Sequence, residues 1–198
     1  HPKKDFCIIE KIKNECGYHV TSECIHKDTG VYTQYFSYQD IGKKLQDYGI
    51  YYDKRIPEIY LRSSFEQRRE LLAGLIDTDG YREGTRILYS STDVGLIDDI
   101  EDLTHSLGLR PYRYSEDAKT STSGIVGRKD VHTIGFQLDF HPPIQVPRKN
   151  PKKIKYLKRR IGIKSVKESE SPEMGNCIEV DSPDGLYLAG KKMVPTHN

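Results

Sequence analysis

Three common features are scarce in this sequence of 198 residues: paired cysteines, long apolar runs and an excess of charge of one sign. The four cysteines, Cys7, Cys16, Cys24 and Cys177, show no CxxC spacing, so they indicate neither a zinc site nor a disulfide framework. No apolar run approaches the roughly 18 residues that a membrane-spanning helix needs, and the opening HPKKDF lacks the apolar core of a signal peptide. We therefore expect a soluble, cytoplasmic protein without a membrane partner.

Charge balance alone does not identify a nucleic-acid-binding protein. The net charge is +2, and residues 1–150 hold 21 Lys and Arg against 23 Asp and Glu, whereas 151–198 hold 10 against 6. The segment RKNPKKIKYLKRR (148–160) has eight basic residues and no acid. It fits both a solvated connector and a phosphate-contacting segment, and it separates an expected domain at 1–150 from a smaller unit at 151–198.

Hydrophobic periodicity predicts an α+β fold. Apolar residues recur at helical spacing in four segments, and β-branched and aromatic residues fill the extended segments between them. The expected elements are helices at 3–16, 38–48, 65–78 and 93–107 and strands at 18–26, 31–36, 86–90, 111–115 and 132–140. The expected helix N-caps include Ser37, Ser64 and Thr92.

The order of these elements repeats along the chain. Helix, hairpin and helix before residue 50 correspond to helix, hairpin and tail at 92–140. The second copy begins with the helix at 65–78, but the equivalent helix of the first copy would lie upstream of His1. We therefore expect the chain to be the later part of a longer polypeptide whose N-terminal part is missing.

The helix at 65–78 ends in LLAGLIDTDG (71–80), an apolar run that stops at two acids and a glycine. Its small residues, Ala73 and Gly74, allow a second helix to approach closely. An Asp at the end of each of two such helices would bring two carboxylates together, and divalent cations such as Mg²⁺ would relieve their repulsion. The motif thus indicates one half of a metal site that can activate water and stabilise the leaving oxygen of a phosphodiester.

LLAGLIDTDG resembles the dodecapeptide motif of the LAGLIDADG homing endonucleases, with Thr78 where alanine is usual. The resemblance implies a pseudo-twofold αββαββα fold, whose two sheets form a saddle for a double-stranded DNA target site. It also implies Mg²⁺ as the cofactor, Asp79 as metal ligand and catalytic residue, and Asp77 as a capping and supporting residue. A core helix with a polar C-cap is the alternative, and the downstream repeat disfavours it.

Two lysines are candidates for catalysis by the same resemblance. DKRIPEIY (53–60) resembles the K-x-I-P block that precedes the second motif in intein-borne members, which implies Lys54 as a catalytic lysine. Lys149, in VPRK, is a weaker candidate for the other half of the site.

Residues in strands after the motif are candidate DNA contacts, because side chains of a sheet that enters the major groove can read bases or hold phosphates. Ordinary solvated strand charges are the alternative for each of them. The first candidates are Tyr81, Arg82 and Arg86, with Arg110 and Arg113 as second choices.

The segment GNCIEVDSPDGLYLAGKKMVPTHN (175–198) resembles the C-terminal splicing blocks of inteins. With expected strands at 160–168, 176–182 and 186–190, it implies the last β-strands of a Hint (intein splicing) domain. The side-chain amide of Asn198 can attack its own backbone carbonyl and cut the following peptide bond, while His197 donates a proton or polarises that carbonyl.

Cys177 departs from the usual splicing pattern, which often has Asp there. Together with Thr196, it resembles the inteins in which an internal cysteine attacks the N-terminal junction. The alternative is a small buried strand residue. In either case the implied partners are an N-terminal intein segment, in cis or in trans, and a host (extein) protein.

Three functions stay open at this point. The first is a splicing intein with a homing endonuclease that becomes active once the N-terminal part completes it, and retention of Asp79 and Lys54 favours this one. The second is a splicing-only intein with a decayed nuclease. The third is a non-catalytic LAGLIDADG DNA-binding module, which the His197-Asn198 pair disfavours. We expect this chain alone neither to splice nor to make a double-strand cut.

Overall fold

The computed structural model describes residues 5–16, 19–25, 27, 30, 32–37, 41–118, 120, 126–152, 154, 162–168 and 174–197, and all structural statements below concern these residues. Its elements, in chain order, are α1 (Phe6–Cys16), β1 (His19–Ile25), β2 (Tyr32–Ser37), α2 (Ile41–Asp47), α3 (Glu58–Leu61), α4 (Phe65–Thr78), β3 (Tyr81–Glu83), β4 (Arg86–Ser91), α5 (Val94–Ser106), β5 (Tyr112–Glu116), β6 (Val131–Gln137), β7 (Tyr187–Ala189) and β8 (Val194–Thr196). Within those ranges, no helix is both long enough and apolar enough to cross a membrane.

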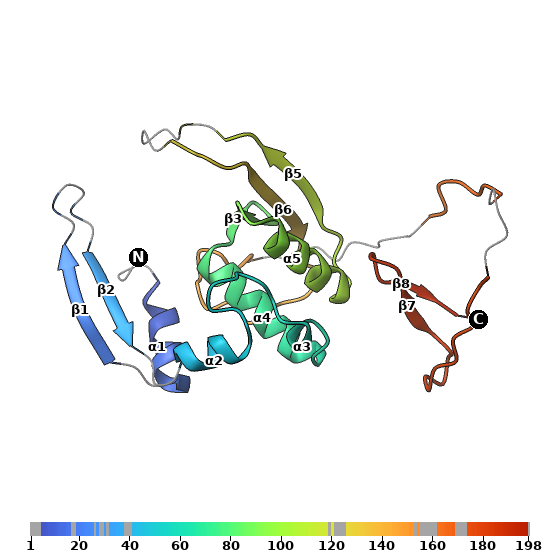
Figure 1. The fold of residues 1–198 in the computed structure, drawn as a ribbon, viewed down its shortest axis with the longest axis horizontal. Coiled ribbons are helices and arrows are strands. Elements are labelled where there is room, and N and C mark those ends of the chain that lie inside the picture. Colours follow the sequence, from blue (N-terminus) through green and yellow to red (C-terminus); the bar gives the residue numbers. More distant parts are fainter. Residues whose placement is uncertain are drawn as a thin grey trace.

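A four-stranded antiparallel sheet with the order β3-β4-β6-β5 lies at the centre of the molecule. Side chains alternate along its strands, so Ile87 and Tyr89 of β4 share one face with Ile134 and Phe136 of β6, and all four are buried. Helices α4 and α5 lie against this sheet (Figure 1). They add to the same core the side chains Leu72, Ala73, Ile76, Leu96, Ile97, Ile100 and Leu103. The part from α4 to β6 is therefore one αββαββ unit around one core.

The segment before α4 has the expected order of helix, hairpin and helix. Strands β1 and β2 pair antiparallel, with an irregularity between Val20 and Ser22. Helix α1 is linked to α4 by an ion pair between Lys11 Nζ and Glu70 Oε2 at 3.1 Å. The β1–β2 hairpin and the β7–β8 hairpin lie at opposite ends of the molecule (Figure 1). Mixed α and β structure, in the predicted order, is thus confirmed.

Several boundaries differ from the prediction. Helix α5 has Asp93 as its N-cap, not Thr92, because the Asp93 carboxylate accepts the Leu96 N–H at 3.1 Å. Helix α2 begins at Ile41, whereas the prediction was a helix at 38–48 with Ser37 as its N-cap. Residues 38–40 lie outside the described ranges, so the predicted start is not tested. Strand β6 ends at 137 instead of 140. The short elements α3 and β3 are too brief to show a periodicity in the sequence.

The C-terminal region has fewer strands than predicted. Residues 162–168 and 176–182 are not in strands, and 160–161 lie outside the described ranges. Strands need a partner to satisfy their backbone groups, and the described part of the chain places none beside these segments. The prediction of a strand at 186–190 is confirmed by β7, which pairs with the unpredicted β8.

Candidate functional site

The site is built on helix α4, whose two ends are defined by local hydrogen bonds. At its start, the Ser64 hydroxyl accepts the Gln67 N–H and the Gln67 side chain accepts the Ser64 N–H, which is a capping box. At its end, the N–H groups of Asp79 and Gly80 both donate to the Leu75 carbonyl, at 3.2 and 3.1 Å. This ending turns the chain out of the helix at Asp79.

Gly80 is required by a close approach of backbone to backbone. A Cβ atom at this position would lie 2.7 Å from Ile76 Cα and 3.0 Å from the Ile76 carbonyl oxygen. Gly80 is also buried under the end of α4. The glycine that closes the motif therefore allows the chain to fold back on the last turn of the helix.

The Asp79 side chain is exposed, and among the described residues one side chain is shown to donate to it. The Tyr89 hydroxyl, on β4, donates to Asp79 Oδ2 at 3.5 Å. Burial and the charge of Asp79 raise the pKa of Tyr89 to about 12, so this hydroxyl keeps its proton at neutral pH. Tyr89 thus offers Asp79 a stable donor and leaves most of its oxygen lone pairs available.

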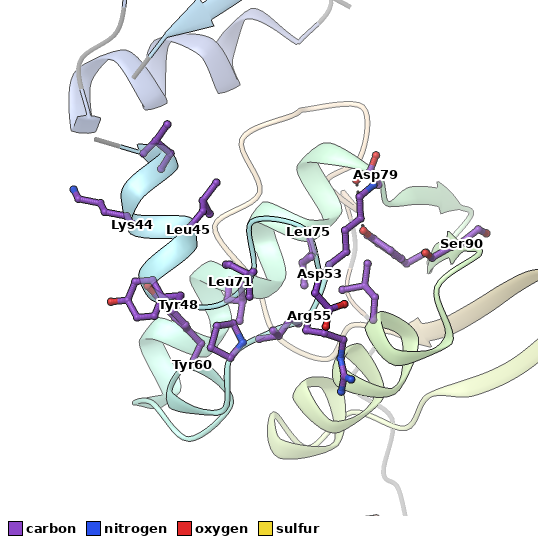
Figure 2. Close-up of a pocket in the computed structure, with 18 residues that line it drawn as sticks. Lys44, Leu45, Tyr48, Asp53, Arg55, Tyr60, Leu71, Leu75, Asp79 and Ser90 are labelled. Atoms are coloured by element: carbon purple, nitrogen blue, oxygen red, sulfur yellow. Dashed lines mark hydrogen bonds between the residues drawn. The ribbon is translucent and has the colours of Figure 1, made fainter. Parts of the chain in front are cut away.

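Asp79 opens onto a cavity of about 620 Å³ between α2, the segment before α3, α4 and β4. Lys54, the predicted catalytic lysine, lines the same cavity. Figure 2 shows Asp79 and Ser90 at one end of the cavity and Tyr48 and Tyr60 at the other. The fold therefore brings Lys54 and Asp79, which are distant in sequence, to one cavity.

The segment that carries Lys54 is anchored by its neighbours. Arg55 donates two hydrogen bonds to the Asp99 carboxylate, each 2.8 Å long, and the Ile56 N–H donates a third at 2.8 Å. Hydrogen bonding to buried Asp99 and its negative charge hold the pKa of Arg55 above its ordinary value. The sequence analysis missed Asp99, although an acid within the apolar stripe of α5 is a signal of a buried partner.

Lys149, the weaker lysine candidate, is not among the residues that line this cavity. It is 4% exposed, and its Nζ donates to the carbonyls of Ile76, Asp77 and Thr78 at 2.9, 2.8 and 2.9 Å. Burial lowers its pKa, and nearby Arg148 lowers it further. In this structure Lys149 is a helix cap and not a residue of the cavity.

The sheet has one face turned away from α4 and α5, and the register shows which candidate DNA contacts lie there. Tyr81 pairs with Leu88 and Arg86 with Gln137, so both candidates are on this open face.

Two other candidate DNA contacts, Arg82 and Arg113, are directed elsewhere. Arg113 binds Asp98 and Glu101 of α5, and Arg82 donates to the carbonyls of Arg148 and Gly84.

Arg110 lies before β5 and approaches the Lys192 carbonyl at 3.5 Å. The guanidinium groups of Arg82, Arg110 and Arg113 thus make contacts within the chain, and their role as DNA contacts stays a prediction. Arg82 and Arg113 lie on the face opposite Arg86, because neighbouring positions of a strand face opposite sides of a sheet.

Sequence reasoning missed two tyrosines on the open face. Tyr112 and Tyr114 of β5 have ring centroids 6.5 Å apart, and the Arg86 guanidinium lies 5.9 Å from the Tyr112 ring. The Tyr112 ring covers Gly135, where a Cβ atom would lie within 2.4 Å of it. The alternation in PYRYS, with tyrosines on either side of Arg113, was the available signal.

Two candidate splicing residues share a second, smaller cavity. Cys177 and His197 both line a space of about 340 Å³, together with Asp184. Thr196, on β8, donates its hydroxyl proton to the Val194 carbonyl at 3.1 Å. Asn198 lies outside the described residues.

Asp79 fits a divalent cation as one ligand of a shared site. Its oxygens are hard ligands and are exposed to solvent. Among the described residues, the hydrogen bond shown to Asp79 is the 3.5 Å contact from Tyr89, so most of the oxygen lone pairs are open to a cation. Among the described residues, no group of three or more His, Cys, Asp and Glu side chains could hold a metal. The described residues therefore offer Asp79 as one ligand, and a cation there would take its other ligands from elsewhere, such as water.

Comparison with known proteins matches residues 66–137 to the LAGLIDADG-like domain family. The matched range coincides with the αββαββ unit from α4 to β6. The chain is also 36% identical, over 165 residues, to the replicative DNA helicase DnaB of Mycobacterium intracellulare. That alignment covers 78% of this chain and 27% of the helicase, so the chain spans about a quarter of the relative's length.

Proposed function

Since residues 66–137 form a LAGLIDADG-like domain, we propose that this chain carries one half of a site-specific DNA endonuclease and that it belongs to the C-terminal part of an intein. The shared cavity of Asp79 and Lys54 carries the first part of the proposal. A second motif helix, on a segment joined to this chain or on a partner, would supply the other acid. The reaction is hydrolysis of phosphodiester bonds in both strands of a DNA target site.

Each cavity residue has a distinct role in this proposal. Asp79 holds Mg²⁺, and Tyr89 keeps the Asp79 carboxylate oriented through its hydrogen bond. Bound Mg²⁺ supplies Lewis acidity toward the phosphate and lowers the pKa of a water molecule. The Lys54 ammonium group is placed to stabilise negative charge that develops on the phosphate.

The open face of the sheet would bind DNA. Arg86 offers five N–H donors for phosphates or for the acceptor edge of guanine, and Tyr81, Tyr112 and Tyr114 offer rings and hydroxyls beside it. The opposite face is filled by α4 and α5, so only this face is open to a large ligand.

The nuclease proposal is tested with the chain joined to an upstream segment that contains a second motif helix, on a library of randomised DNA sites. Asp79→Asn should lower the cleavage rate by about a hundredfold or more, and Lys54→Met by about tenfold to a hundredfold. Lys44→Met is the matched control, because Lys44 lines the same cavity from α2. Cleavage that survives Asp79→Asn would contradict the assignment.

DNA binding is tested separately by fluorescence anisotropy on the selected site. Arg86→Ala should weaken binding by about fivefold to a hundredfold and reduce its salt dependence. Arg62→Ala, which removes another exposed arginine from the turn after α3, should leave affinity unchanged. Equal losses from both variants would indicate a nonspecific charge effect.

The intein part of the proposal draws on the helicase alignment. An insertion shared by two proteins produces an alignment that is long in this chain and short in the helicase, which is the pattern seen. His197 and Asn198 have the chemistry for splicing, and Cys177 lines one cavity with His197. These residues would form the C-terminal part of a Hint domain that extends over 151–198 and an N-terminal intein segment.

The cleavage step is a cyclisation. The side-chain nitrogen of Asn198 forms a bond to the Asn198 carbonyl carbon, and the bond from that carbon to the nitrogen of the host protein's next residue breaks. His197 gives a proton to the leaving nitrogen and regains the proton that the side-chain nitrogen loses, and Asn198 becomes a succinimide. Cys177 is the proposed nucleophile at the N-terminal junction, and Thr196, the last residue of β8, directly precedes His197.

Splicing is tested by supplying the N-terminal segment and flanking host sequence and by measuring ligated product by mass spectrometry. Asn198→Ala should abolish C-terminal cleavage. Cys177→Ala should abolish splicing if Cys177 is the nucleophile, whereas Cys24→Ala, at another exposed free cysteine, should have no effect. Cleavage that persists in Asn198→Ala would overturn the cyclisation role, and splicing that persists in Cys177→Ala would assign the first step to another residue.

A further inference from the structure

The turn between β7 and β8 meets helix α5 of the αββαββ unit (Figure 1). Lys191 Nζ lies 2.9 Å from Glu101 Oε2, and Arg110 approaches the Lys192 carbonyl at 3.5 Å. Both contacts join residues that are far apart in the chain. The C-terminal hairpin, which leads directly to His197, is therefore joined to the αββαββ unit by polar contacts at its turn.

Three acids form the surface of α5 that receives this turn. Asp98, Glu101 and Asp102 follow one another at helical spacing, so they lie on one side of the helix, and we call them the acidic face of α5. Like charges at this spacing repel each other. Arg113 of β5 pairs with Asp98 and Glu101, and Lys191 brings a second cation to Glu101. The acidic face is thus electrostatically complementary to a basic turn.

The β7–β8 turn, residues 190–193, has a backbone that presents two lysines at its tip. Gly190 and Met193 have positive φ angles of 68° and 49°, and the Met193 N–H donates to the Gly190 carbonyl at 3.0 Å. Among the described residues, Met193 is the one non-glycine residue with a positive φ, a conformation that side chains other than glycine disfavour. The turn closed by these two residues leaves Lys191 and Lys192 between them.

The contact between Lys191 and Glu101 is electrostatic and partly open to water. The Glu101 side chain is 17% exposed and the Lys191 side chain is 60% exposed. Burial alone would raise the pKa of Glu101, but hydrogen bonds from Lys191 and Arg113 hold it below its ordinary value. Hydrogen bonding to Glu101 raises the pKa of Lys191, and the charges of Asp98 and Asp102 add to this effect. Because salt weakens exposed ion pairs, the contact can open without unfolding of either part.

We propose that the β7–β8 turn docks reversibly on the acidic face of α5 through Lys191, and that this contact holds the C-terminal hairpin against the LAGLIDADG-like domain. Apolar packing does not replace it, since Leu186 and Leu188 of the hairpin region are 43% and 56% exposed. The docking surface lies on the α5 side of the sheet, away from the open face that carries Arg86. The inference goes beyond the proposed function, because neither DNA cleavage nor splicing enters it.

The first test is zero-length crosslinking of the full chain with a carbodiimide, which joins a lysine amine to a carboxylate that it contacts. Peptide mapping by mass spectrometry should find an amide between Lys191 and Glu101 at low salt. Its yield should fall by about threefold or more at about 1 M NaCl, where charges are screened within about 3 Å. The link between Lys11 and Glu15, which one helix keeps close, is the reference for the yield of the reaction.

The second test measures whether the hairpin tumbles with the domain, by ¹⁵N relaxation of the β7, β8 and α5 amides. Lys191→Glu replaces attraction by repulsion, so it should lower the ratio of docked to undocked hairpin by about tenfold and shorten the correlation time of β7 and β8. The swapped pair, Lys191→Glu with Glu101→Lys, should restore slow tumbling. Lys167→Glu, the same change at an exposed lysine of the segment 162–168, should have no effect.

The outcomes either support or overturn the docking contact. A mixture of ¹⁴N and ¹⁵N chains distinguishes links within one chain from links between two chains, and links between chains alone would overturn it. So would absence of the Lys191–Glu101 link at low salt, or equal mobility of the hairpin in Lys191→Glu and Lys167→Glu. Fast tumbling that persists in the swapped pair would refute Glu101 as the partner. Since no readout needs DNA or an N-terminal segment, failure of the nuclease or splicing proposal would leave the inference standing.

Discussion

The two glycines of LLAGLIDTDG should respond to alanine substitution in opposite directions. At Gly74, an added Cβ atom would meet nothing within 4 Å. At Gly80, it would lie 2.7 Å from Ile76 Cα, an atom of the helix backbone that cannot move aside without disturbing the last turn of α4. Gly74→Ala therefore adds a methyl group on an open helix surface, whereas Gly80→Ala introduces a steric clash.

The expected changes in the free energy of unfolding follow from these contacts. Gly74→Ala should stabilise the chain by about 0.5–1 kcal/mol, because alanine loses less backbone entropy in a helix. Gly80→Ala should destabilise it by about 2 kcal/mol, within the range for overpacked sites. In a chain of this size the melting temperature should rise by about 1–4 °C in the first variant and fall by about 4–8 °C in the second.

Urea unfolding and thermal unfolding, both followed by far-ultraviolet circular dichroism, measure these differences. Wild-type stability in Gly80→Ala would refute the close approach of Gly80 to Ile76. A loss of stability in Gly74→Ala would show that another helix already packs against Gly74 in this chain. Gain of stability in Gly74→Ala, combined with lower nuclease activity of the completed protein, would support a second motif helix at that position.

Three further predictions concern the stability of the domain. Asp99→Ala should cost about 1–3 kcal/mol by urea unfolding, because the Ile56 N–H loses its acceptor and Arg55 loses its ion-pair partner; an unchanged midpoint would refute the anchor. Ser64→Ala should cost about 1 kcal/mol in the same assay through loss of the capping box, and no change would show that the cap is dispensable. Burial lowers the pKa of His105, so the folded state resists its protonation and stability should fall as the pH decreases below about 6.5. His105→Leu should reduce that pH dependence, and an identical pH profile would contradict it.

Secondary structure was largely predictable because its signals are local. The apolar stripe from Leu96 to Leu103 gives α5, and Ser64 with Gln67 marks the start of α4. The prediction of strands at 160–168 and 176–182 was wrong at the described positions. A segment rich in β-branched residues forms a strand only where a partner strand lies beside it, and composition does not reveal that partner. The N-cap of α5 was wrong by one residue, since Thr92 and Asp93 are both suitable caps and the backbone conformation selects between them.

The site was predictable only in part. The motif predicts Asp79 and the K-x-I-P block predicts Lys54 as site residues, and the fold brings both to one cavity. Residue type alone does not show which face of a strand an arginine side chain occupies. Arg113 is directed to the acids of α5, while Arg86 lies on the open face next to Tyr112.

The sequence by itself determined α4, α5 and the longer strands β4, β5 and β6 of the αββαββ unit, and the motif that places an acid at the end of α4, because capping, periodicity and glycine geometry act over a few residues. Tertiary structure decided which polar groups meet. Lys149 binds carbonyls more than 70 positions earlier in the chain, and Asp99 binds a segment more than 40 positions earlier. Such pairings depend on the packing of whole elements, so no local pattern in the sequence reveals whether a lysine faces a substrate cavity or caps a helix.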